Sequence, residues 1–133
     1  MEKSDILAAF NNHFNDYLDD IERIFPEDMD IKTAINYLKS IRKMNPRLVI
    51  RIWKSYICDP YREPIINGDI NFFMNKSFNE DIQYLDTQKS QKEILDKIEY
   101  IKTITMQMGE DNLKKNLEYI QNLLKICDLY HSS

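Results

Sequence analysis

Turn-forming residues are scarce in this chain, which has two glycines and four prolines among 133 residues. A sheet with many hairpins needs frequent turns, and glycine and proline mark most of them. Apolar residues instead recur at three- and four-residue spacing over long stretches, which is typical of amphipathic helices. The sequence therefore predicts an all-α fold, a compact bundle of about five to six helices.

Size and composition favour one folded domain. A 16.0 kDa chain buries about 68% of its unfolded surface on folding, which is enough for a single core. The hydrophobic fraction of 43% and the charged fraction of 30% are those of globular proteins. No apolar run is long enough to cross a membrane, and the first residues lack a secretory signal pattern. We expect a single helical domain over residues 1–133 that does not bind membranes.

The N-terminal part, residues 1–58, is predicted to hold three helices. The first is expected to start at Ser4, an N-cap residue type, and to stop before Pro26. The second is expected after an acidic turn, with Asp30 as its N-cap. The third is expected to follow Asn45–Pro46, with Asn45 as its cap, and to end at Asp59–Pro60.

Residues 59–85 are predicted to form an aromatic-rich connector. A short helix from Pro64 that Gly68 closes is expected within it, because glycine suits the position after a helix. A short pair of strands is the alternative there. The density of aromatic side chains, Phe72 and Phe73 among them, indicates that this connector packs against the core.

The C-terminal part, residues 86–131, is predicted to be a helical hairpin. One helix is expected from about Thr87 until Gly109 terminates it, and Asp111 or Asn112 is expected to cap the last helix. A link this short places consecutive helices side by side and antiparallel.

The sequence offers little catalytic chemistry. Its two histidines, His13 and His131, lie near opposite ends, and neither has the clustered partners that a metal site needs. Two glycines cannot build a phosphate-binding loop. We therefore expect no catalytic residue, no metal site and no cofactor.

The two cysteines, Cys58 and Cys127, fall on apolar helical faces. Without a secretory signal we expect both to be buried free thiols, and a disulfide in a secreted domain is the alternative. Cys127 and His131 stand four residues apart, so a thiol–imidazole contact is geometrically allowed. Apolar burial raises the pKa of a thiol, which opposes its use as a nucleophile.

Charge is distributed unevenly, although the net charge is −4. Residues 1–30 hold nine acids, and residues 31–58 hold seven bases and no acid. Three interpretations of the basic stretch remain open: neutralisation within the monomer by the acidic first helix, contact with an acidic protein surface, or contact with nucleic acid. Aromatic and arginine side chains dominate interfaces. The predicted partner-binding residues are Lys39, Arg42, Lys43, Arg47, Arg51, Lys54, Trp53, Phe72 and Phe73.

Several short patterns resemble one protein family. They are Phe25-Pro26-x-Asp28, Arg42-Lys43-x-Asn45-Pro46, Gly68-Asp69-Ile70-x-Phe72-Phe73 and Tyr119-Ile120-Gln121-Asn122-Leu123. Together they are similar to those of an uncharacterised family of short helical proteins in nucleocytoplasmic large DNA viruses of algae and protists. The likeness spans nearly the whole chain and consists of core and cap residues without a catalytic signature. It implies a viral origin and a place in the virion or in the viral factory of the host cytoplasm.

These observations lead to one functional expectation. The chain is expected to be a non-enzymatic structural or adaptor protein of a large DNA virus, possible partners being a capsid or virion component or a host protein. A nucleic-acid-binding or transcription-associated factor that uses the basic face of residues 32–54 is the alternative. A homodimer through the two C-terminal helices is a third hypothesis.

Overall fold

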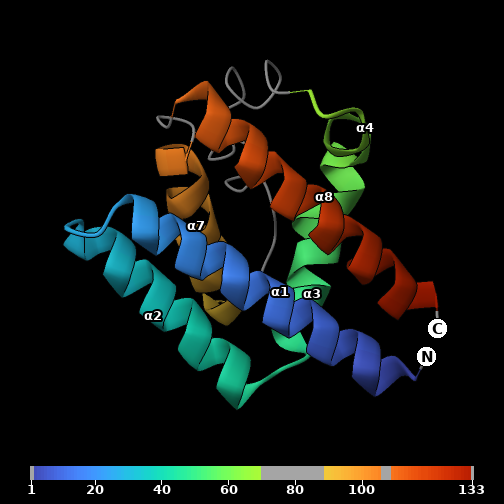
Figure 1. Cartoon of the computed structure of the whole chain (residues 1–133). Coiled ribbons are helices and arrows are strands. Elements are labelled where there is room, and N and C mark those ends of the chain that lie inside the picture. The colour runs from blue at the N-terminus through green and yellow to red at the C-terminus, as the bar shows by residue number, and fades with distance from the viewer. Residues whose placement is uncertain (1, 70–88, 106–108, 133) are drawn as a thin grey trace.

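The computed structural model describes residues 2–69, 89–105 and 109–132, and every regular element within these ranges is helical (Figure 1). The elements are α1 (Lys3–Ile24), α2 (Met29–Met44), α3 (Leu48–Trp53), a π-helical turn (Lys54–Cys58), α4 (Asp59–Asn67), α7 (Lys89–Thr105) and α8 (Glu110–Ser132). The predicted all-α bundle is thus confirmed.

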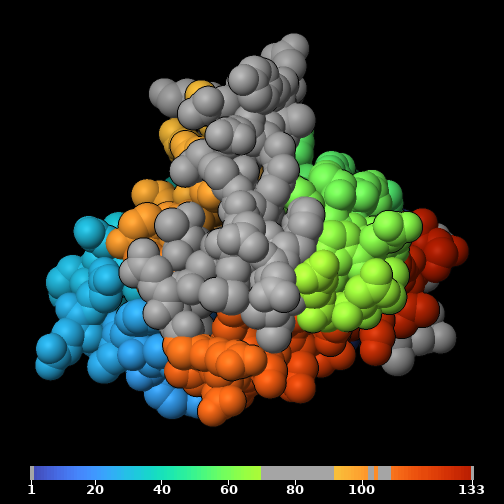
Figure 2. Space-filling view, turned by 90° about the horizontal axis from the view of Figure 1, so that it is seen from above, coloured from blue at the N-terminus to red at the C-terminus, as the bar shows by residue number. Residues whose placement is uncertain are grey.

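Helix α1 lies at the centre of the bundle, between α2 and α8 (Figure 1). Its most extensive contact is with α8, and α7 packs chiefly against α2. Seen from above, α2 and the first part of α7 occupy one side of the molecule, and α4 with the last turns of α8 occupies the other (Figure 2). The two ends of the chain meet at one edge, where α1 begins and α8 ends (Figure 1).

The positions at which α1 and α2 begin differ from the prediction. Helix α1 begins at Lys3 with Glu2 at its N-cap position, so Ser4 lies inside the first turn. Asp28, and not Asp30, caps α2, because its Oδ1 accepts a hydrogen bond of 3.0 Å from the backbone N–H of Ile31. A cap side chain reaches the amide three residues ahead, and Asp28 is the acid at that distance.

The prediction that Asp59–Pro60 ends the third helix is confirmed only in part. Helix α3 continues through the π-helical turn into α4, and the helical backbone then breaks at Tyr61, which has a φ of −119° and a ψ of 23°. The wider π turn shifts the hydrogen-bond register, so that Pro60 falls in the first turn of α4, where its missing N–H needs no partner. At the other end, Arg47 occupies the N-cap position, while Asn45 contributes only its carbonyl, to the N–H of Leu48.

Helix α4 ends where the sequence predicts. Gly68 has a φ of 65°, a left-handed conformation that an L side chain adopts only with strain, and its N–H bonds to the carbonyl of Ile65. The rest of the predicted connector, from residue 70 to 85, lies outside the described residues.

The predicted pair of C-terminal helices is present as α7 and α8. Helix α8 begins at Glu110, and the N–H of Leu113 bonds to the carbonyl of Gly109. Asp111 and Asn112, the predicted caps, therefore lie within its first turn. The two helices follow each other across a short link and then diverge to their main neighbours, α2 and α1.

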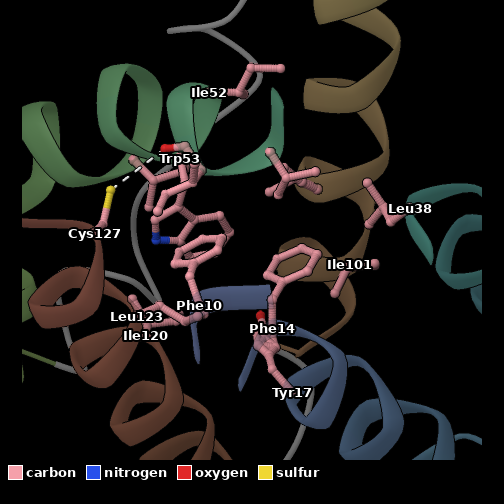
Figure 3. Packing of buried hydrophobic residues seen from close by; sticks show 14 of the residues in the cluster. Phe10, Phe14, Tyr17, Leu38, Ile52, Trp53, Ile101, Ile120, Leu123 and Cys127 are labelled. Atoms are coloured by element: carbon pink, nitrogen blue, oxygen red, sulfur yellow. Dashed lines mark hydrogen bonds between the residues drawn. The ribbon is translucent and has the colours of Figure 1, made fainter. Parts of the chain in front are cut away.

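The core is built around Trp53 of α3, which is 1% exposed. Phe10, Phe14 and Tyr17 of α1 meet its ring edge to face at centroid distances of 6.5, 5.6 and 6.4 Å (Figure 3). Such geometry is favourable for aromatic rings. This cluster joins the end of α3 to the middle of α1.

Candidate partner-binding surface

The structure divides the predicted basic residues by what each side chain touches. Lys39 is paired with Asp19 of α1, and Lys54 Nζ lies 2.9 Å from Asp59 Oδ2. The hydrogen bond that Lys54 donates to Asp59 raises the pKa of Lys54 above its usual range. Neutralisation within the chain, one of the three open interpretations, therefore describes these two lysines.

Arg42 is half-buried and also bound within the chain. Its Nη1 donates a hydrogen bond of 3.5 Å to the carbonyl of Asn11, which holds the last turns of α2 against α1. Asn11 is itself buried, and its Nδ2 donates to the carbonyl of Pro46. Arg42 thus positions the connection between α2 and α3, with little of its side chain open to a partner.

Lys43, Arg47 and Arg51 are exposed. Among the residues that the structure describes, none of the three side chains forms an ion pair or a hydrogen bond. Arg47 and Arg51 are four residues apart at the start of α3 and so project from one face of this segment. They are the predicted cations that remain available.

Arg47 and Arg51 line a groove of about 250 Å³ at the edge where the chain ends meet. The other residues of this basic groove are Lys3, Ser4, Leu7 and Tyr130. Lys3 Nζ lies 4.7 Å from the centre of the Tyr130 ring, a cation–π contact between α1 and α8. The groove therefore combines three cations and two hydroxyls with an apolar wall.

Trp53 does not belong to this surface, contrary to the prediction. It is a core residue because three aromatic side chains of α1 cover its ring. The other predicted aromatic contacts, Phe72 and Phe73, lie outside the described residues. Lys3 and Tyr130 are groove residues that the sequence did not indicate, since they are at opposite ends of the chain and no local pattern links them.

The chain has a second groove, of about 430 Å³, between α4 and α8. Its walls are mainly apolar, from Ile65, Ile66 and Leu124, and its two charged residues have opposite signs. One of them, Asp128, is bound by Arg62 through two hydrogen bonds. This groove keeps one exposed cation, Lys125, whereas the basic groove has three cations.

Both cysteines are buried free thiols, as predicted. His131 Nδ1 lies 2.9 Å from the carbonyl oxygen of Cys127 and 3.6 Å from its Sγ. A carbonyl only accepts, so Nδ1 carries the hydrogen and cannot take the proton of the Cys127 thiol. That thiol points instead to the carbonyl of Ile50 at 3.5 Å (Figure 3). The pair does not have the geometry of a nucleophile and its base.

Two further features concern metals and membranes. Within residues 2–69, 89–105 and 109–132, no three His, Cys, Asp or Glu side chains are grouped as a metal site requires. Over the same ranges, no helix combines the length and the hydropathy of a bilayer span.

Comparison of the chain with protein-family models, with curated proteins and with solved structures found no match.

Proposed function

We propose that this protein is a non-enzymatic structural or adaptor protein that binds an acidic segment of another protein in the basic groove. The observation that carries the proposal is the pair Arg47 and Arg51, exposed and unpaired among the described residues, beside Lys3 on one groove. Cations gathered in this way repel one another, and a negatively charged partner relieves that repulsion.

The lining of the groove indicates the chemistry of the partner. A guanidinium binds a carboxylate through two parallel hydrogen bonds, which gives direction as well as strength. Leu7 and Tyr130 supply apolar surface next to these cations. An acidic segment that also carries an apolar side chain fits both features, and arginine with tyrosine is a frequent combination at the energetic centre of interfaces.

Nucleic acid is less well supported as a partner. Neutralising a duplex requires a track of cations that follows several phosphates. Asp19 and Asp59 form ion pairs with Lys39 and Lys54, respectively. The predicted basic face of residues 32–54 is therefore interrupted. Of the cations that remain in this stretch, Arg47 and Arg51 line one groove.

The biological setting belongs to the same proposal and rests on the family resemblance alone. A large DNA virus would place the protein in the virion or in the host cytoplasm, where it would join a larger viral assembly through this groove.

A charge-reversal experiment tests the proposed function. The double variant Arg47→Glu/Arg51→Glu is compared with the control Lys92→Glu/Lys114→Glu, which makes the same charge change at exposed lysines outside the groove. The dissociation constant for acidic peptides that contain one apolar residue is measured for each. We expect the groove variant to lose at least about tenfold in affinity, about 1.4 kcal/mol, and the control to bind as the wild type does.

Equal affinity of the groove variant and the control for these peptides would show that the basic groove is not the binding surface. The same titration against duplex and single-stranded DNA tests the alternative. Tight DNA binding whose affinity falls steeply with salt would favour nucleic acid as the partner.

A further inference from the structure

Two sulfur atoms from distant parts of the sequence meet inside the bundle. Cys58 ends the π-helical turn, Cys127 lies near the end of α8, and both side chains are fully buried. The π turn packs against α8, and the two thiols lie close enough to influence each other. Neither the partner-binding surface nor the proposed function uses this pair.

A network of charges joins the same two elements. Arg62 of α4 binds Asp128 of α8 through both carboxylate oxygens, at 2.6 and 3.0 Å. Arg62 also binds Asp59 at 3.2 Å, and Lys54 binds the other oxygen of Asp59 at 2.9 Å. These bonds hold α4, and through it the π turn, against α8.

The network also affects the charge that each sulfur can carry. The Lys54 ammonium is within electrostatic reach of Cys127, and the Arg62 guanidinium is within reach of Cys58. Interaction with Cys127 and burial raise the pKa of Cys58, so the Cys58 thiol is neutral at rest. A thiolate that forms transiently at either position has a cation nearby to stabilise it.

We propose that Cys58 and Cys127 are an oxidisable pair that closes to an intramolecular disulfide when a peroxide oxidises one of the thiols. The geometry points to Cys127 as the first thiol to react. It lies within two turns of the end of α8, and helix ends fray more readily than helix interiors. The Nδ1–H of His131, 3.6 Å from the sulfur, can then donate to a thiolate there.

The chemical steps balance with peroxide as the oxidant. The Cys127 sulfur attacks one peroxide oxygen, the O–O bond breaks, and the products are a sulfenic acid on Cys127 and water. The Cys58 sulfur then attacks the Cys127 sulfur, the S–S bond forms and the S–O bond breaks. The hydroxide leaves as water with the proton of Cys58. Overall the two thiols lose two electrons and the peroxide gains them.

The disulfide would lie directly beneath the basic groove. The carbonyl that accepts from the Cys127 thiol belongs to Ile50, the neighbour of Arg51, and Tyr130 follows Cys127 on α8 within one turn. A covalent bond between the π turn and α8 would therefore fix the two sides of the groove relative to each other.

The experiment treats the reduced full-length protein with hydrogen peroxide, quenches it with an alkylating reagent under denaturing conditions, and measures the intact mass and a peptide map. We expect a mass loss of two hydrogen atoms, no alkylation, and one linked peptide pair that contains Cys58 and Cys127. Dithiothreitol should restore both alkylations. The thermal midpoint should rise on oxidation, because the bond closes a long loop over residues 59–126.

Single-cysteine variants provide the control. Cys58→Ala should leave Cys127 as a sulfenic acid that dimedone traps, and no intramolecular link should form. If a variant does not fold, the peptide map of the wild type still shows whether the disulfide between Cys58 and Cys127 forms. Wild-type thiols that both remain alkylatable, when glutathione in the same tube is fully oxidised, would overturn the proposal. Disulfides that form only between molecules would overturn it equally.

Discussion

Lys3 Nζ lies 4.7 Å from the centre of the Tyr130 ring, which joins the first turn of α1 to the last turns of α8. Both residues line the basic groove, so this contact also shapes the proposed binding surface. An exposed cation–π contact contributes about 0.5–1 kcal/mol. A double-mutant cycle of Lys3→Met and Tyr130→Leu, followed by urea unfolding, should show a favourable coupling free energy of about this size. A coupling free energy of zero would show that the contact between Lys3 and Tyr130 does not stabilise the fold.

Trp53 and Arg51 are two residues apart but should respond to substitution very differently. Trp53 is 1% exposed and contacts three aromatic rings of α1, so Trp53→Ala should lower the free energy of unfolding by about 3–5 kcal/mol. Arg51 is exposed, and Arg51→Ala should change the free energy of unfolding by about 0.5 kcal/mol or less. Chemical denaturation of both variants measures the difference. Similar free energies of unfolding would contradict the burial of Trp53.

The helices could be predicted because their evidence is local. The apolar spacing around Phe10 and Phe14 predicts one buried face whatever lies opposite it, and Gly68 marks a helix end through its own backbone conformation. Helix starts were less certain where several residues could cap, as with Asp28 and Asp30 in one acidic turn. The π turn before Pro60 cannot be predicted, because it depends on tertiary packing and has no sequence signature.

The candidate surface could be predicted only in part, because exposure depends on partners distant in sequence. The spacing of Arg47 and Arg51 indicates a shared face, and the structure leaves both open. Nothing in the sequence around Lys39 shows that Asp19 pairs with it. The contribution of Tyr130 to the groove follows from the packing of α8 against α1, which no local pattern reports.

The cap of α2 provides a matched pair of substitutions. Asp28→Ala removes the acceptor of the Ile31 N–H and should lower the free energy of unfolding by about 1 kcal/mol. Asp30→Ala should have a smaller effect, since Asp30 is an exposed first-turn residue that acts only through the helix dipole. The two urea midpoints can be compared directly. A larger loss of stability in Asp30→Ala than in Asp28→Ala would show that Asp30 caps α2, as the sequence predicted.

Asp59 should make the free energy of unfolding depend on pH. Its hydrogen bond with Lys54, reinforced by Arg62, holds the pKa of Asp59 below its usual value. Between the lowered pKa and the ordinary value of about 3.9, the unfolded chain binds more protons than the folded chain. The contribution of Asp59 is therefore complete at neutral pH and is lost as the pH falls through the lowered pKa.

This contribution should be about 1 kcal/mol or less, because the Asp59 side chain is 46% exposed and solvent screens its ion pairs. Asp59→Asn should accordingly be less stable than the wild type at neutral pH, with a difference that shrinks in acid. Asp96→Asn, at an exposed position of α7, is the control. A difference for Asp59→Asn that does not change with pH would contradict the role of the ion pairs.

Photo-crosslinking from the basic groove tests the central claim most directly. A photoreactive amino acid replaces Ser4, which lines the groove, and in a control protein it replaces Asn36, an exposed residue of α2 outside it. The account predicts that Ser4 crosslinks to an acidic, apolar-bearing segment of another protein, that Asn36 does not, and that Arg47→Glu/Arg51→Glu abolishes the product. Crosslinks that go to nucleic acid, or that persist unchanged in the charge-reversed protein, would contradict it.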